Sequence, residues 1–303
     1  MSPRLSVATL LLLAALGAPL AAQESSSSAP SSATPASAQP PEPEPSAETP
    51  DTEPTAPAAP LTSAELGNAF RIDTLTIPGP GELMAALNKG SRPNWQNEYR
   101  EPIPTTFSSR AQIALNVGGL IADGYIALEA EDSQQVKNIG KDIITLAKSL
   151  AVSDSVIARG NSIIDFAENN EWSALKEELE ATQNEVKLAL EQQHDGDLVW
   201  LVSLGGWIRG TDAVSGWIAN NYTPDAARLL RQPAIISLMR ERMKTLPDKV
   251  QADPLVENVT RKLDNLETLV SFPPDAAPTL DDVKKLKEAT SDLVEEISKK
   301  EAK

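Results

Sequence analysis

The chain has 303 residues, with 43 acidic and 27 basic side chains, one histidine and no cysteine. The lack of cysteine excludes disulfide bonds, thiol nucleophiles and cysteine-ligated metal or iron–sulfur centres. Because His194 is the single histidine, sites that need two imidazoles are excluded as well. The net charge of -16 argues against binding to nucleic acid or to an anionic membrane. We expect neither a metal nor a cofactor.

Residues 1–22 have the layout of a secretory signal peptide. Arg4 supplies the positive start, an apolar run covers 7–16, and Leu20-Ala21-Ala22 fits a cleavage site before Gln23. The apolar run is shorter than the roughly 20 residues that a spanning helix prefers, so cleavage is favoured over a retained anchor. We therefore expect an exported bacterial protein, periplasmic or extracellular, with no transmembrane segment after signal cleavage.

Residues 23–60 are predicted to be a disordered spacer. They consist mainly of Ser, Ala, Pro and Glu, and they carry six acidic side chains and no basic one. Such a composition buries too little apolar surface to offset the loss of chain entropy on folding. The next segment, 61–106, reads as an irregular strap with one short helix at 82–88. An extended piece is expected at 70–77, and Trp95, Tyr99 and Phe107 are expected to pin the strap to the domain behind it.

The remaining residues, 107–303, are predicted to form an all-α domain, a multi-helix bundle of about eight helices, because apolar side chains recur at helical spacing. The last helix has a narrow apolar seam that is typical of a coiled coil, although docking onto the domain is favoured. The expected helices cover 109–131, a segment from Ser133, 154–168, 171–194, 197–220, a short piece after Thr223, 233–246, 254–271 and 280–300.

Two helices share a pattern of adjacent glycines. Gly118-Gly119 in the first helix and Gly205-Gly206 in the fifth stand in similar apolar surroundings, 87 positions apart. Glycine inside a helix costs about 0.5–1 kcal/mol against alanine, and close backbone approach is the usual compensation. We predict that the two helices cross at these pairs in the centre of the domain. The small residues Ser203, Gly206 and Gly210 are expected to extend this helix-packing stripe.

The charged residues inside these apolar helices are the strongest candidates in the sequence for a functional site. Asp123 lies in the first helix, and Arg209 and Asp212 lie in the fifth. An isolated buried charge is very costly, so these groups must be paired, bound to a ligand or turned outward. The favoured interpretation is a structural Arg209–Asp212 pair with Asp123 at the rim. The alternative is a site in which Asp123 comes near Arg209.

The sequence contains no recognisable catalytic motif, and we predict a non-enzymatic protein. The leading hypothesis is a helical protein that binds an envelope partner or associates with itself. The alternative is a carrier of a small molecule or lipid, with a pocket near Trp200, Trp207 and Arg209 and with Asp123 and Asp212 as further ligand-binding residues. The layout of signal peptide, Pro-rich spacer and helical domain is similar to that of bacterial envelope proteins.

Overall fold

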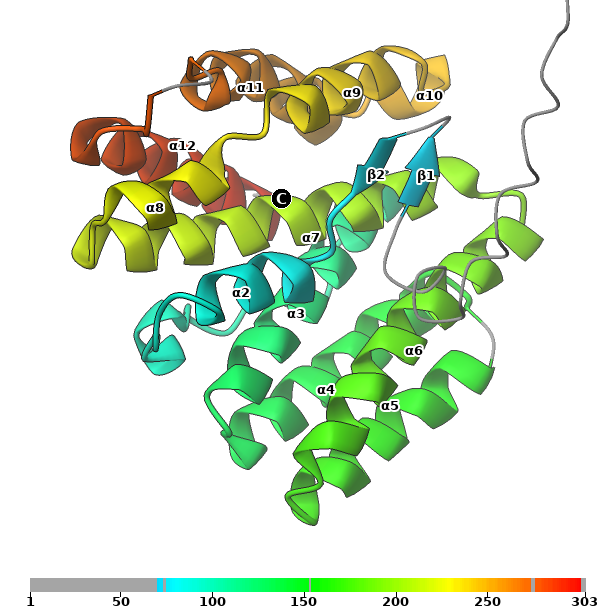
Figure 1. The fold of residues 1–303 in the computed structure, drawn as a ribbon. Coiled ribbons are helices and arrows are strands. Elements are labelled where there is room, and N and C mark those ends of the chain that lie inside the picture. Colours follow the sequence, from blue (N-terminus) through cyan, green and yellow to red (C-terminus); the bar gives the residue numbers. More distant parts are fainter. Residues whose placement is uncertain (1–69, 73–74, 153, 274–275, 301–303) are drawn as a thin grey trace, which may run out of the picture. The chain divides into compact units, whose positions relative to one another are not determined.

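The computed structural model describes residues 70–72, 75–152, 154–273 and 276–300. The predicted signal peptide and spacer lie outside the described residues. The described part is an all-α fold, as predicted (Figure 1). Its β-structure is one short antiparallel hairpin of β1 (Phe70–Ile72) and β2 (Leu75–Ile77), with Phe70 opposite Ile77.

Helices α3 (Arg110–Glu129) and α7 (Gly196–Asn220) form the centre of the fold. They are buried on all sides, from Ala111 to Leu128 in α3 and from Leu198 to Gly216 in α7. A helix that is apolar around its whole circumference needs such cover. Among the described residues, α3 is also the helix that is long and apolar enough to span a bilayer by composition, and its apolar window is fully buried in the fold.

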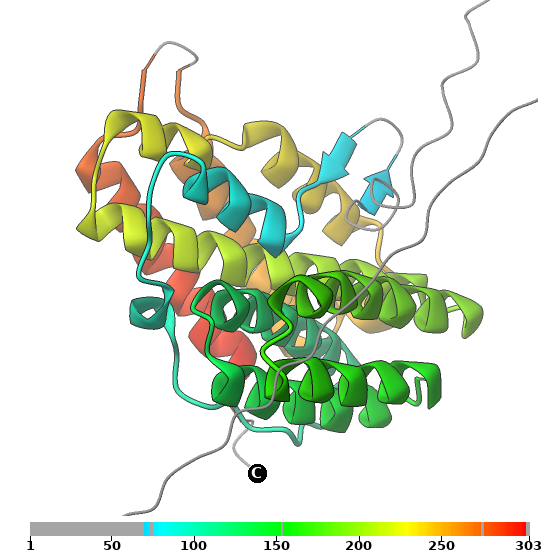
Figure 2. The ribbon, with the colours of Figure 1, turned by 60° about the horizontal axis from the view of Figure 1, so that its bottom comes forward.

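Three antiparallel helices follow α3 and cover one side of the central pair (Figure 2). They are α4 (Ser133–Ser149), α5 (Asp154–Glu168) and α6 (Trp172–Gln192). Each neighbour along the chain packs on the previous helix, so the layer is a row of αα-hairpins. Their apolar faces account for the helical spacing seen in the sequence, and their charged faces remain outside.

The turns that join α3 through α7 share one geometry. Each ends its helix with a non-glycine residue in the left-handed region, with φ between 51° and 62°: Glu131, Ala151, Asn170 and His194. In each, the next residue donates a backbone hydrogen bond five positions back, of 2.9–3.3 Å, for example from Asp195 to Leu190. This Schellman closure satisfies the last carbonyls of the helix. His194 therefore closes a turn.

The elements on the other side of α7 come from both ends of the described chain (Figure 1). Helix α12 packs on α7 and α11, and α11 pairs with α9. The predicted helix ranges agree with these elements to within a few residues, whereas η1 and α10 were not predicted. The bounds are α2 Pro80–Asn88, η1 Trp95–Glu98, α8 Pro224–Ala227, η2 Arg228–Leu230, α9 Pro233–Lys244, α10 Asp248–Gln251, α11 Pro254–Val270 and α12 Leu280–Ser298.

The coiled-coil-like seam of α12 is turned inward. All five seam residues are buried in the fold, where α12 meets α7 and α11. The structure therefore confirms the favoured interpretation that α12 docks onto the domain through this seam. The seam residues are Val283, Leu286, Thr290, Leu293 and Ile297.

Candidate functional site

The two central helices meet backbone to backbone at one glycine of each pair. A Cβ on Gly118 would overlap the backbone oxygen of Val202, and a Cβ on Gly205 would overlap that of Leu115. Only glycine fits at such a contact. The helix crossing expected at the glycine pairs is thus present, and it brings the polar residues further along α3 and α7 together.

The second glycine of each pair makes room for the N-terminal strap. A Cβ on Gly119 would lie 3.2 Å from the Arg100 guanidinium, and one on Gly206 would lie 3.3 Å both from the Pro80 ring and from the Gly118 backbone oxygen on α3. A Cβ on Gly210 would likewise lie 3.3 Å from the Cα of Pro80, and its nearest neighbours belong to α2 instead of α3. The expectation that Gly210 extends the α3–α7 stripe is wrong, because α2 occupies that face of α7.

Arg209 lies at the centre of a buried charge network. Its Nε donates to Asp123 Oδ1 at 2.8 Å, its Nη1 donates to Asp212 Oδ2 at 2.9 Å, and its Nη2 donates to the backbone oxygen of Glu98. Arg209 is 2% exposed, and Asp123 is buried with it. The Arg209–Asp212 pair expected from the sequence is present, but Asp123 is not at the rim, since the helix crossing places it against Arg209.

Asp212 connects this network to α12. Its Oδ1 accepts hydrogen bonds from Lys287 Nζ at 2.7 Å and from Ser291 Oγ at 2.8 Å, and Thr290 Oγ1 lies 3.4 Å away. Thr290 is buried, and its hydroxyl also reaches the backbone oxygen of Leu286 at 3.0 Å, so the polar residue in the apolar seam is satisfied within its own helix. The carboxylate is fully satisfied and holds α12 against α7.

Arg100 connects the network to the strap. Its Nε donates to Asp123 Oδ2 at 2.8 Å, and its Nη1 donates to Ser298 Oγ at 2.9 Å. Tyr99 Oη adds a hydrogen bond of 3.3 Å to Asp132. The network therefore joins the strap, α3, α7 and α12, and it fixes the path of residues 98–100 across the two central helices.

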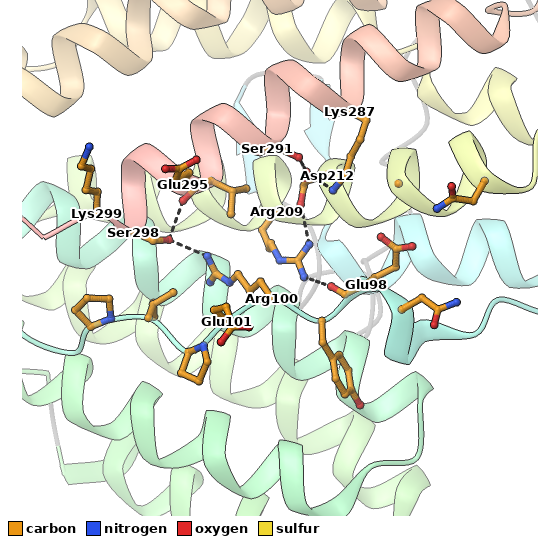
Figure 3. Close-up of a pocket in the computed structure, with 18 residues that line it drawn as sticks. Glu98, Arg100, Glu101, Arg209, Asp212, Lys287, Ser291, Glu295, Ser298 and Lys299 are labelled. Atoms are coloured by element: carbon orange, nitrogen blue, oxygen red, sulfur yellow. Dashed lines mark hydrogen bonds and ion pairs between the residues drawn. The ribbon is translucent and has the colours of Figure 1, made fainter.

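A cavity of about 580 Å³ opens above this network (Figure 3). The strap residues 97–104, the C-terminal half of α7 and the exposed edge of α12 form its walls. Charged and hydroxyl groups gather at one part of the lining, which includes Arg209, Asp212 and Lys287, whereas Ile103 and Val294 add apolar surface. A concave site with an apolar wall and a few fixed polar groups is typical of small-ligand binding.

Glu98 is the lining residue whose environment is most unusual. It is 8% exposed, and among the described residues its carboxylate has no hydrogen-bond or ion-pair partner. A Cβ on Gly216 would overlap this carboxylate, so the glycine provides its space. Burial raises the pKa of Glu98 above its ordinary value, and Lys287 and Arg209 oppose that shift through their charges.

Trp200 and Trp207 do not line this cavity. Both indoles are 0% exposed, and Trp207 Nε1 donates to Gln232 Oε1 at 2.8 Å. They are packing residues of α7, which is the commoner role of aromatic side chains at helical spacing. Arg209 and Asp212 line the cavity, whereas Asp123 lines a neighbouring cavity of about 60 Å³. The predicted site residues are therefore divided between the core and the cavity floor.

The sequence did not predict Glu98, Arg100, Lys287, Ser291 or Ser298 as site residues. Residues 98 and 100 lie in a segment without periodicity, between the prolines at 93 and 102. Thr290, a polar residue at a seam position, gave no signal for the site either, because its hydroxyl can bond the Leu286 backbone oxygen of its own helix.

A second polar cluster lies between α2 and α6. Burial lowers the pKa of Lys187 to about 8, against the opposing charges of Glu191 and Glu82. The pKa of Tyr125 is raised, mainly by burial. The adjoining cavity is only about 150 Å³, which is small for an organic ligand.

In the part of the chain that the structure describes, no three acidic or histidine side chains come together as a possible metal site. Comparison of the chain with protein-family models, with curated proteins and with solved structures finds no match.

Proposed function

We propose that the chain is an exported, non-enzymatic binding protein that holds a small molecule in the cavity between the strap, α7 and α12. The observation that carries this proposal is the cavity of about 580 Å³ above a satisfied buried charge network. A network with its hydrogen bonds in place rigidifies its surroundings, so the site needs little reorganisation to bind. This proposal keeps the alternative from the sequence, a carrier of a small molecule. It places the pocket beside the strap instead of beside Trp200 and Trp207.

The hydroxyl groups of the cavity support a non-enzymatic role. Ser291 Oγ donates its hydrogen to Asp212, and Ser298 Oγ donates to the backbone oxygen of Val294. A serine nucleophile needs a base that takes its proton, and the backbone oxygen of Val294 cannot do so. The Asp212 carboxylate beside Ser291 is engaged in ion pairs with Arg209 and Lys287. His194 closes the turn after α6 and is not a cavity residue.

Binding to an envelope partner or self-association, the leading hypothesis from the sequence, has less support. The seam of α12 is buried, which removes the apolar stripe that a second copy could use. Among the described residues, Leu188 is the large apolar side chain that is exposed, at 51%, and protein interfaces need a contiguous patch.

Native mass spectrometry of the protein purified from its own host tests the proposal. We expect the processed chain, starting at Gln23, to carry an added mass that denaturation releases. Asn220 is exposed at the cavity, so the larger side chain of Asn220→Trp should obstruct the cavity and abolish the added mass. Asn221→Trp changes an exposed neighbour outside the lining and should keep it. A native protein without added mass, or an Asn220→Trp variant that retains it, contradicts the proposal.

A further inference from the structure

The unpartnered carboxylate of Glu98 indicates what the cavity binds. Glu98 ends η1, and its side chain fits beside α7 because position 216 is a glycine. Glu98 is 8% exposed as a whole residue, so its carboxylate keeps only limited contact with solvent at the cavity, and it gains no hydrogen bond from any described residue. Burial of an unpaired charge is costly, so such a group persists where something else supplies its partner.

The cations nearest to Glu98 are engaged elsewhere. All three guanidinium nitrogens of Arg209 donate to other oxygens, and one of these is the backbone oxygen of Glu98 itself. Lys287 Nζ donates to Asp212 at 2.7 Å. These cations reduce the cost of the Glu98 charge at a distance but donate no hydrogen bond to its carboxylate, and Glu98 lines the cavity.

We propose that the small molecule bound in this cavity carries a primary ammonium group, which donates hydrogen bonds to the Glu98 carboxylate. This inference rests on the proposed function. An ammonium group combines the N–H donors that the carboxylate lacks with the opposite charge, and charge-assisted hydrogen bonds are the stronger kind. The organic part of the ligand lies along Ile103 and Val294.

The charge of the folded part favours the same class of ligand. Residues 61–303 carry 37 acidic and 26 basic side chains, which is a net charge of -11. Such a protein attracts cations and repels anions at long range. The acidic balance therefore increases the local concentration of ammonium compounds, and Glu98 provides the short-range selection.

Ligand-observed NMR with two probes tests this inference on the full mature chain. Hexylammonium has N–H donors, and hexyltrimethylammonium has the same charge and tail without them. We expect the wild type to bind hexylammonium at least tenfold more tightly than hexyltrimethylammonium. Glu98→Gln should lose this preference, and exposed Glu177→Gln should keep it. Thermal unfolding verifies that both variants fold.

Equal binding of the two probes by the wild type overturns the inference, and this comparison requires no variant. Saturable hexylammonium binding that persists unchanged in Glu98→Gln overturns it as well. A native ligand without a basic nitrogen refutes the ammonium class and leaves the proposed function intact. If Asn220→Trp binds hexylammonium as the wild type does, the cavity is not the site and both proposals fail.

Discussion

The backbone oxygen of Val202 on α7 lies where a Cβ on Gly118 of α3 would stand. The contact is between two main chains, so no rotamer change can relieve an added methyl group. We expect Gly118→Ala to lower the free energy of unfolding by about 3 kcal/mol, the upper part of the usual cost of overpacking. Urea unfolding followed by circular dichroism measures it.

Gly196 is the matched control for this substitution. It is the first residue of α7, and a Cβ there would have no atom within 4 Å. Gly196→Ala should be neutral or stabilising by up to about 1 kcal/mol, because alanine restricts the unfolded chain. If the two variants have equal stability, the close crossing of α3 and α7 is refuted.

Arg209 should behave as a structural residue. Arg209→Ala leaves Asp123 and Asp212 as buried carboxylates without their central partner. Removing one member of a buried ion pair costs about 3–5 kcal/mol, so we expect a large loss of stability in chemical denaturation. Arg228→Ala, which removes an exposed pair with Asp225, should change stability little. A well-folded, stable Arg209→Ala protein would contradict the central role of this network.

Much of the fold could be predicted from the sequence because its determinants are local. Helical spacing of apolar residues, Thr223 followed by Pro224, and Pro233 at a helix start each act within a few residues. The glycine pairs added one long-range relationship, because glycine in two apolar helices requires a packing reason. The contacts of the second glycine in each pair could not be predicted, since Pro80 precedes the predicted helix at 82–88 and Arg100 lies in a segment without helical periodicity.

The cavity could not be predicted for the same reason. Its key acid, Glu98, is placed by a hydrogen bond from Arg209 to its main chain and by the space at Gly216. Neither relationship leaves a pattern in the sequence, because the partners are more than 100 positions away from Glu98. Trp200 and Trp207 were predicted to lie at a pocket, whereas both are fully buried packing residues.

Glu98 should make stability depend on pH. Its pKa is raised in the fold, chiefly by burial, and the charged groups facing it are Lys287 of α12 and Arg209 and Asp212 of α7. The folded protein therefore holds this proton more tightly than the unfolded chain, whose group titrates near 4.5. The resulting stabilisation is present below that pH and is lost as pH rises through the folded pKa.

Glu98→Gln removes this dependence, so its Tm relative to the wild type should increase from pH 4 to pH 8. Differential scanning calorimetry of the two proteins across that range measures the effect. Exposed Glu177→Gln provides the baseline. A Tm difference that is constant or decreases with pH would show that the Glu98 carboxylate is not buried without a partner.

The inward seam of α12 predicts an intramolecular contribution to stability. Leu286 is fully buried in the seam, and Leu286→Ala should cost about 2–5 kcal/mol through lost contacts and a cavity. Exposed Lys284→Ala on the same helix should be near neutral. Since the seam packs within one chain, the Tm of the wild type should not change over a hundredfold range of protein concentration. A rising Tm would indicate that the seam joins two copies.

Replacing a left-handed turn residue by glycine should stabilise the protein. Ala151 has φ of 57°, a conformation that costs an L-residue roughly 1–2 kcal/mol and glycine almost nothing. Ala151→Gly should therefore stabilise the protein by about 1 kcal/mol, because relief of strain exceeds the added entropy of the unfolded chain. The same change at exposed Ala158, inside α5, should destabilise it by about 1 kcal/mol. Urea midpoints that shift in opposite directions support the turn geometry, and a loss of stability in both variants would refute it.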